Sequence, residues 1–137
     1  MREYTQFYIN GQWVDPAEEK LFDVINPATE EVCAHISLGG QADVDVAASA
    51  AKEAFKTYGH SSREERIELL EAIVVEYKNR YNDLAAAISE EMGAPKTLSE
   101  KNQTGAGLGH LKTALEVLKD YAFQEELGNS RICKEPD

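Results

Sequence analysis

The chain has 137 residues, of which 42% are hydrophobic, so it is long enough to form one domain with a packed core. Its 25 acidic side chains outnumber its 14 basic ones and give a net charge of −11. This charge argues against nucleic acid and anionic membranes as partners, because both need a basic surface. No apolar run approaches the roughly 20 residues that span a bilayer, and the first residues lack the apolar core of a signal peptide, which predicts a cytoplasmic protein.

Two β-hairpins are predicted near the start of the chain. Residues 7–14 place Asn10-Gly11 between two short arms of aromatic and β-branched residues. Asn-Gly is the strongest short-range hairpin signal, because both residues tolerate positive φ. Residues 21–36 hold two further predicted strands, which turn at Asn26-Pro27-Ala28-Thr29.

The cysteines and the first loop histidine suggest no chemistry. Cys33 lies in a predicted strand with no base beside it in the sequence, so we expect an inert, structural thiol. Cys133 is far away along the chain, so the pair has no metal-binding spacing, and both thiols are expected to be free and buried. His60 is interpreted as a solvated loop residue, because no ligating partner accompanies it.

Alanine-rich sequence after Gly39-Gly40 predicts a first helix over about residues 41–57. Asp43 falls in its first turn, where negative charge suits the helix dipole. An apolar stripe, rich in alanine, indicates close approach to a neighbouring element. Its members are Val44, Ala47, Ala48, Ala51 and Phe55.

A longer helix is predicted over residues 62–92. Its apolar residues recur in steps of three and four from Ile67 to Ile88, which places one stripe on one face of a helix. At its start Ser62 and Glu65 form a capping box, and at its end Gly93 and Pro95 stop the helix. Asn82 is a competing cap that allows a break within this span.

A third helix is predicted over residues 98–121, with Thr97 and Glu100 as its capping box. Glycines at 105, 107 and 109 do not follow a strand and lack the Gly-x-Gly-x-x-Gly spacing, so we reject a dinucleotide loop and interpret them as small residues for tight packing. Residues 125–136 then predict two short strands around Gly128-Asn129.

Six segments in order resemble the opening of the NAD(P)-dependent aldehyde dehydrogenase superfamily. One of them departs from the family's Glu-x-Gly-Lys-Pro turn, because Ala94 replaces the lysine. Another, Glu135-Pro136, resembles the dipeptide that leads into the family's first nucleotide-binding strand. The six segments are residues 8–14, 24–32, 43–45, 62–66, 90–95 and 135–136.

The resemblance implies an enzyme that oxidises an aldehyde to a carboxylic acid with NAD or NADP. In the family a cysteine attacks the aldehyde to form a thiohemiacetal, backbone and asparagine groups hold its oxygen, and a glutamate activates water. Those residues lie beyond position 137, so no residue of this chain is assigned a catalytic or cofactor-binding role, and no cofactor is expected to bind this segment. Some members hold a monovalent cation at positions matching Val24, Ile25 and Glu91. Here we interpret these residues as part of a turn held by ordinary hydrogen bonds, so no metal ligand is assigned.

The expected fold is therefore α/β in the parent enzyme, with a Rossmann-type cofactor domain, while this segment is mainly α-helical with N-terminal β-hairpins. Residues 1–124 are expected to be the N-terminal part of the cofactor domain, and residues 125–137 the start of an oligomerisation hairpin. We expect a homo-oligomer, and turnover of an aldehyde only in the longer enzyme. The alternative functions are a free-standing helical interaction module and, more weakly, a small nucleotide-binding protein.

Overall fold

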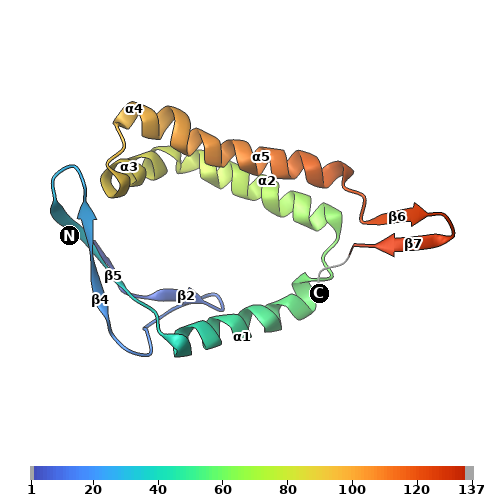
Figure 1. Ribbon diagram of the computed structural model, residues 1–137, viewed down its shortest axis with the longest axis horizontal. Coiled ribbons are helices and arrows are strands. Elements are labelled where there is room, and N and C mark those ends of the chain that lie inside the picture. Colours follow the sequence, from blue (N-terminus) through green and yellow to red (C-terminus); the bar gives the residue numbers. More distant parts are fainter. Residues whose placement is uncertain (1, 135–137) are drawn as a thin grey trace.

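The computed structural model describes residues 2–134, in which helices predominate and strands lie at both ends (Figure 1). The N-terminal strands are β1 (Arg2–Tyr4), β2 (Phe7–Ile9), β3 (Gln12–Val14), β4 (Leu21–Asn26) and β5 (Glu31–Ser37). They are followed by α1 (Gln41–Tyr58), α2 (Arg63–Asn79), α3 (Tyr81–Met92), α4 (Lys96–Leu98), a π-helix (Ser99–Gln103) and α5 (Thr104–Asp120). The last two strands are β6 (Gln124–Leu127) and β7 (Ser130–Cys133).

Both predicted N-terminal hairpins are confirmed. Strands β2 and β3 pair antiparallel around Asn10 and Gly11, whose φ angles are 52° and 78°, as a tight two-residue turn requires. Strands β4 and β5 pair antiparallel with a register shift between Val24 and Ile25. The sequence analysis did not anticipate β1, which pairs parallel with β5 and completes a sheet of order β1-β5-β4.

A carboxylate fastens α1 to the loop that precedes β4. The Asp43 side chain accepts hydrogen bonds from the backbone amides of Ala17 and Gly40, each at 2.8 Å. These two bonds stabilise the charged form and lower the pKa of Asp43. None of the residues of α1 is buried, and Figure 1 shows this helix lying apart from α2 and α5.

The long helix expected over residues 62–92 is divided into α2 and α3. Its start is as predicted, because Ser62 and Glu65 form the reciprocal capping box. Its end is also as predicted, with Gly93 in the left-handed conformation at φ 68°. The break lies at Arg80, with φ −100° and ψ 13°, rather than at the competing cap Asn82.

The third helix also departs from the expected residues 98–121. It begins as α4 at Lys96 and passes through the π-helix before α5. Thr97 and Glu100 do not cap it; Pro95 precedes the first turn, and Glu100 lies near Lys96 at 3.7 Å. The π-helix arises where the Thr104 amide reaches back five residues to the Ser99 carbonyl.

Helices α2 and α5 lie side by side (Figure 1). The small apolar core has one residue on each of these two helices, and the others lie on β5, on α3 and directly after α3. The buried hydrophobic residues are Ala34, Val74, Ala85, Ala94 and Leu115. Three of them are alanines, so the elements approach closely but bury little side-chain volume. Within residues 2–134 no helix has the length and hydrophobicity needed to cross a membrane.

Candidate functional site

Glycines 105, 107 and 109 lie in α5, so their amides serve the helix and form no phosphate cradle. A Cβ placed on Gly107 would lie 2.3 Å from the hydroxyl oxygen of Tyr77, and one on Gly105 would lie 3.4 Å from that of Tyr81. The glycines therefore make room for two tyrosines from the neighbouring helices. The residues described here do not fit a dinucleotide at this run.

The two tyrosines donate hydrogen bonds to backbone carbonyls in the π-helix and at the first residue of α5. Tyr77 donates its hydroxyl hydrogen to the Thr104 carbonyl at 2.9 Å, and Tyr81 donates to the Glu100 carbonyl at 2.6 Å. Thr104 in turn donates to the Ser99 carbonyl at 2.8 Å, and Ser89 donates to the Ser99 hydroxyl at 2.8 Å. The side chains of Ser99 and Thr104 are fully buried, so this cluster is a polar joint between α2, α3 and α5.

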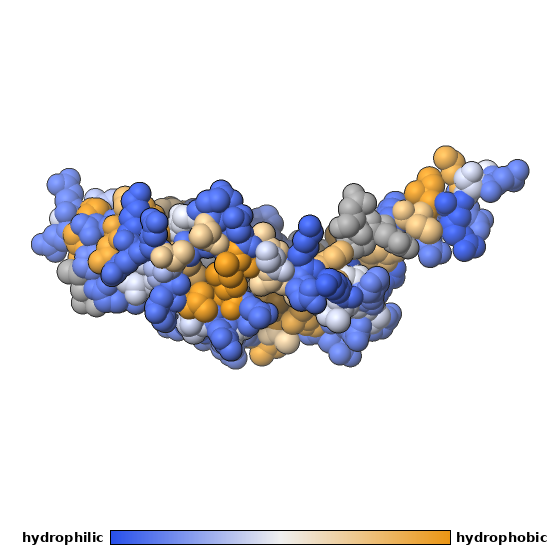
Figure 2. Space-filling model, turned by 90° about the horizontal axis from the view of Figure 1, so that it is seen from below, coloured by the Kyte–Doolittle hydropathy of each residue, from blue (hydrophilic) through white to orange (hydrophobic). Residues whose placement is uncertain are grey.

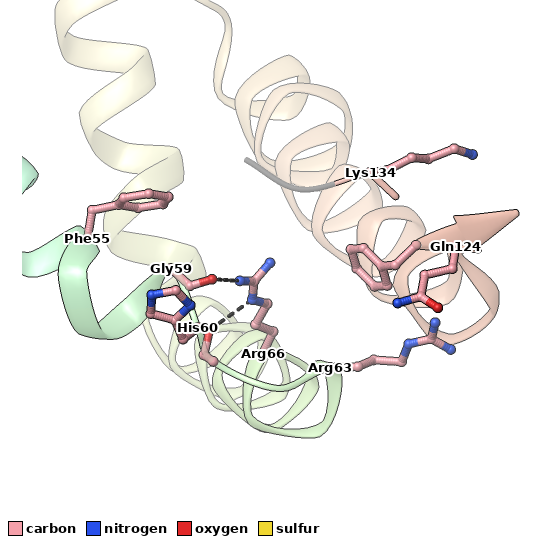
Figure 3. Close-up of a pocket in the computed structure, with 9 residues that line it drawn as sticks. Phe55, Gly59, His60, Arg63, Arg66, Gln124 and Lys134 are labelled. Atoms are coloured by element: carbon pink, nitrogen blue, oxygen red, sulfur yellow. Dashed lines mark hydrogen bonds between the residues drawn. The ribbon is translucent and has the colours of Figure 1, made fainter. Parts of the chain in front are cut away.

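A hollow of about 340 Å³ lies where α1, α2 and the hairpin β6–β7 approach one another (Figure 3). Among residues 2–134, four basic side chains and two aromatic rings line it, and none of the lining residues in this range is acidic. This lining is unusual in a chain with a net charge of −11. The residues are His60, Arg63, Arg66 and Lys134, with Phe55 and Phe123.

Both arginines of this hollow hold helix ends. Arg66 donates to the Ser61 hydroxyl at 2.8 Å and to the Gly59 carbonyl at 3.1 Å, at the C-terminal end of α1 (Figure 3). Arg63 donates to the carbonyls of Lys119 and Tyr121, at the C-terminal end of α5. A cation at a helix C-terminus also suits the helix dipole. The hollow therefore lies where helix ends meet, and its two arginines donate hydrogen bonds that hold these ends together.

Within residues 2–134 the lining offers no nucleophile with an activating base. The Ser61 hydroxyl donates its one hydrogen to the Tyr58 carbonyl at 2.7 Å and accepts from Arg66, so no base receives that hydrogen. Lys134 pairs with Glu125, and this hydrogen bond raises the pKa of the lysine and keeps it protonated. The arrangement supports packing and shows no geometry for general base catalysis.

The structure separates the two cysteines and gives them different surroundings. Cys33 is partly buried in β5 and donates its thiol hydrogen to the Val24 carbonyl at 3.3 Å, in keeping with a structural thiol. Cys133 is exposed on β7, so the expectation that both thiols are buried is wrong for this one. It lies in a short hairpin that is open to solvent on every residue, which the pattern of the strand alone did not reveal.

The positions matching the family's cation site come from segments that the fold brings together. Gly93, which follows α3, packs against Pro27 in the turn after β4, where a Cβ on the glycine would lie 2.8 Å from the ring. The turn itself is held by ordinary hydrogen bonds, because the Asn26 side chain accepts from the Ala28 amide at 2.9 Å. That Val24, Ile25 and Glu91 form an ordinary turn without a bound cation remains a prediction.

Comparison with known proteins agrees with this fold. The aldehyde dehydrogenase family pattern matches residues 13–134. A curated relative, 3-succinoylsemialdehyde-pyridine dehydrogenase from a Pseudomonas species, is 46% identical over 99% of this chain and 29% of its own length. The chain belongs to the aldehyde dehydrogenase family.

Two solved structures of aldehyde dehydrogenases have the same fold as this chain over most of its length. An aldehyde dehydrogenase from Bartonella henselae matches with a TM-score of 0.92 and 43% identity, over 94% of this chain and 27% of its own. Aldehyde dehydrogenase C from Pseudomonas syringae, solved with NAD+ and octanal, matches with a TM-score of 0.90 and 38% identity, over 93% of this chain and 26% of its own. The chain thus spans less than a third of the length of these relatives.

Proposed function

We propose that this chain is the N-terminal segment of an enzyme that oxidises an aldehyde to a carboxylic acid with NAD or NADP. Residues 1–124 then form the N-terminal part of the cofactor domain, and residues 125–137 begin an oligomerisation hairpin. The observation that supports this proposal is the family match over residues 13–134, together with a fold that follows the relatives' N-terminal part. The aldehyde is attacked by a cysteine supplied by the remainder of such an enzyme.

The described residues contribute a scaffold to that reaction. The polar joint around Ser99 and Thr104 fixes the angle between α3 and α5, and Arg63 fixes the end of α5 against the start of α2. Rigid elements hold reacting groups more accurately than loops do. The family match over residues 13–134 counts against a free-standing interaction module, because such a module has no reason to match one enzyme family over most of its length.

A chimeric enzyme tests the proposal directly. Residues 13–134 replace the matching segment of the Pseudomonas relative, which is 46% identical to this chain. We expect a soluble enzyme whose kcat/KM lies within about tenfold of the relative's, a loss of under about 1.4 kcal/mol in transition-state stabilisation. The measurement is the absorbance of the reduced cofactor during oxidation of the relative's aldehyde.

The control is the same chimera with the relative's nucleophilic cysteine replaced by alanine, which removes the chemistry but keeps the fold. An insoluble or inactive chimera, made from a chain that is folded on its own, would contradict the proposal. It would favour the interaction module instead.

Alone, the 137-residue chain is expected to show no dehydrogenase activity with a panel of aldehydes and either cofactor. The reason is that no nucleophile–base pair was found among residues 2–134, where Cys33 bonds to a carbonyl and Cys133 is exposed on a hairpin. The assay again follows the reduced cofactor. Turnover that survives purification and disappears in Cys33→Ala or Cys133→Ala would overturn this expectation.

A further inference from the structure

The short strand β1 is held to the molecule by side chains on both of its faces. On one face Arg2 forms an ion pair with Glu90 of α3. On the other face Glu3 pairs in register with His35 of β5, and His35 pairs in register with Asp23 of β4. Directly opposed residues on neighbouring strands lie close enough for their side chains to interact.

The imidazole of His35 lies between two carboxylates. Its Nδ1 is 2.8 Å from Oε1 of Glu3, and its Nε2 is 3.2 Å from Oδ1 of Asp23. Only the protonated ring has a hydrogen on both nitrogens, whereas the neutral ring turns a lone pair toward one of the two carboxylates. The arrangement therefore suits the imidazolium ion.

The charges around His35 act in the same direction. The hydrogen bond to Glu3 raises the pKa of His35 most; partial burial opposes this, and the negative charges of Glu3 and Asp23 raise the pKa further. The positive charge of the chain's amino terminus opposes them slightly. On β5 itself the next residue on this face is Ser37, which is uncharged, and on the opposite face Arg2 pairs with Glu90 of α3.

We propose that protonation of His35 fastens β1 to the sheet, so that residues 2–4 form an N-terminal strap whose attachment weakens as the pH rises. The sign follows from the raised pKa of His35. The stabilisation is complete below the pKa of about 6.5 of an unperturbed histidine and is lost as the pH passes through the higher pKa of the attached state. Two carboxylates then face each other across a neutral ring.

The strap is short and exposed enough for the loss of one proton from His35 to change its attachment. It has three residues, all exposed, and it forms the edge of its sheet. Tyr4 lines a hollow of about 570 Å³ with Ile73 and Leu84, between β1 and the helices α2 and α3. Release of the strap uncovers this hollow and the edge of β5, and leaves the antiparallel pair β4–β5 in place.

Amide hydrogen exchange on the full 137-residue chain tests the strap, between about pH 5 and pH 8, where histidine changes its charge. After correction for intrinsic rates, we expect the amides of β1, and those amides of residues 34–36 that bond to β1 rather than to β4, to lose protection as His35 titrates. The ring signals of His35, followed by nuclear magnetic resonance, give its pKa in the same samples. We expect this pKa to lie above the ordinary histidine value.

Two variants and one control make the result decisive. His35→Gln is expected to remove the pH dependence. Glu3→Gln is expected to lower the pKa of His35 and to loosen the strap near pH 5, where His35 is charged and its ion pair with Glu3 is lost. His110→Gln changes an exposed histidine of α5 and is expected to leave the strap unchanged. Protection of β1 that stays constant through the titration of His35, or survives in both strap variants, would overturn the proposal. Glu3→Gln keeps the test valid if His35→Gln does not fold.

Discussion

Replacing Gly107 with alanine is expected to destabilise the chain, although alanine is the better helix former. The new Cβ would lie 2.3 Å from the hydroxyl oxygen of Tyr77 and 3.1 Å from its ring, so Tyr77 must move and lose its hydrogen bond to Thr104. Overpacking costs about 1–3 kcal/mol, and a carbonyl deprived of its donor costs about 1–3 kcal/mol. The gain in helix propensity returns only about 1 kcal/mol, so the net loss is about 1–5 kcal/mol.

Gly109 provides the matched control, two positions along the same helix. No atom lies within 4 Å of a Cβ placed there, so Gly109→Ala is expected to stabilise the chain by about 0.5–1 kcal/mol. Urea unfolding at one protein concentration, with the slope m compared between variants, measures both changes. Tyr77→Phe removes the clashing oxygen, so it is expected to reduce the cost of Gly107→Ala in a double-mutant cycle. Equal effects at Gly107 and Gly109 would contradict the packing argument.

The same glycines show how far the sequence could predict this region. The rejection of a nucleotide loop depended on local spacing, and the structure likewise has helix there. The π-helix could not be predicted, because its surroundings come from other parts of the chain: Tyr81 bonds to the Glu100 carbonyl within it, and Tyr77 bonds to Thr104 directly after it. A backbone arrangement stabilised by distant side chains leaves no periodic signal of its own.

Strand β1 escaped prediction for a related reason. Three residues are too few to show alternation, and the partner β5 lies thirty or so positions away in the sequence, as the pairing of Arg2 with Ala34 shows. The cluster of Glu3, Asp23 and His35 was therefore missed as well, since only the register of three strands brings these residues into one row. The hairpins and the capping box at Ser62 were predictable because their signals are local.

The amount of exposed surface shows that this chain leaves much of its apolar surface uncovered. It exposes 10338 Å², whereas a compact monomer of 15.2 kDa exposes about 7,100 Å². The difference is about 3,200 Å² on one chain, whereas each partner of an obligate interface contributes roughly 1,000–2,500 Å², half of the total buried. Viewed from below Figure 1, the side on which α1 lies, hydrophobic side chains gather in the middle of the molecule and also along the hairpin β6–β7 (Figure 2).

We therefore expect the isolated chain to form homodimers or larger assemblies. Exposed apolar patches of several hundred Å² usually lead to association. Val44 and Val46 on α1 are 58% and 57% exposed, and Leu127 on β6 is 70% exposed. The net charge of −11 opposes association, but at physiological salt the Debye length is about 8 Å and this repulsion is screened. Light scattering across a concentration series measures the assembly.

Substitutions that add one negative charge, either to α1 or to the hairpin β6–β7, show which of these two surfaces mediates association. Val44→Glu places a carboxylate on the apolar stripe of α1, and Ser49→Glu adds the same charge to the same helix away from Val44, as the matched control. Leu127→Glu tests the hairpin. We expect Val44→Glu or Leu127→Glu to weaken association by more than tenfold, about 1.4 kcal/mol, because a carboxylate buried in an apolar contact must be desolvated. A clean monomer that also fails to bind a hydrophobic dye would show that the chain needs no further cover, and would return support to the free-standing module.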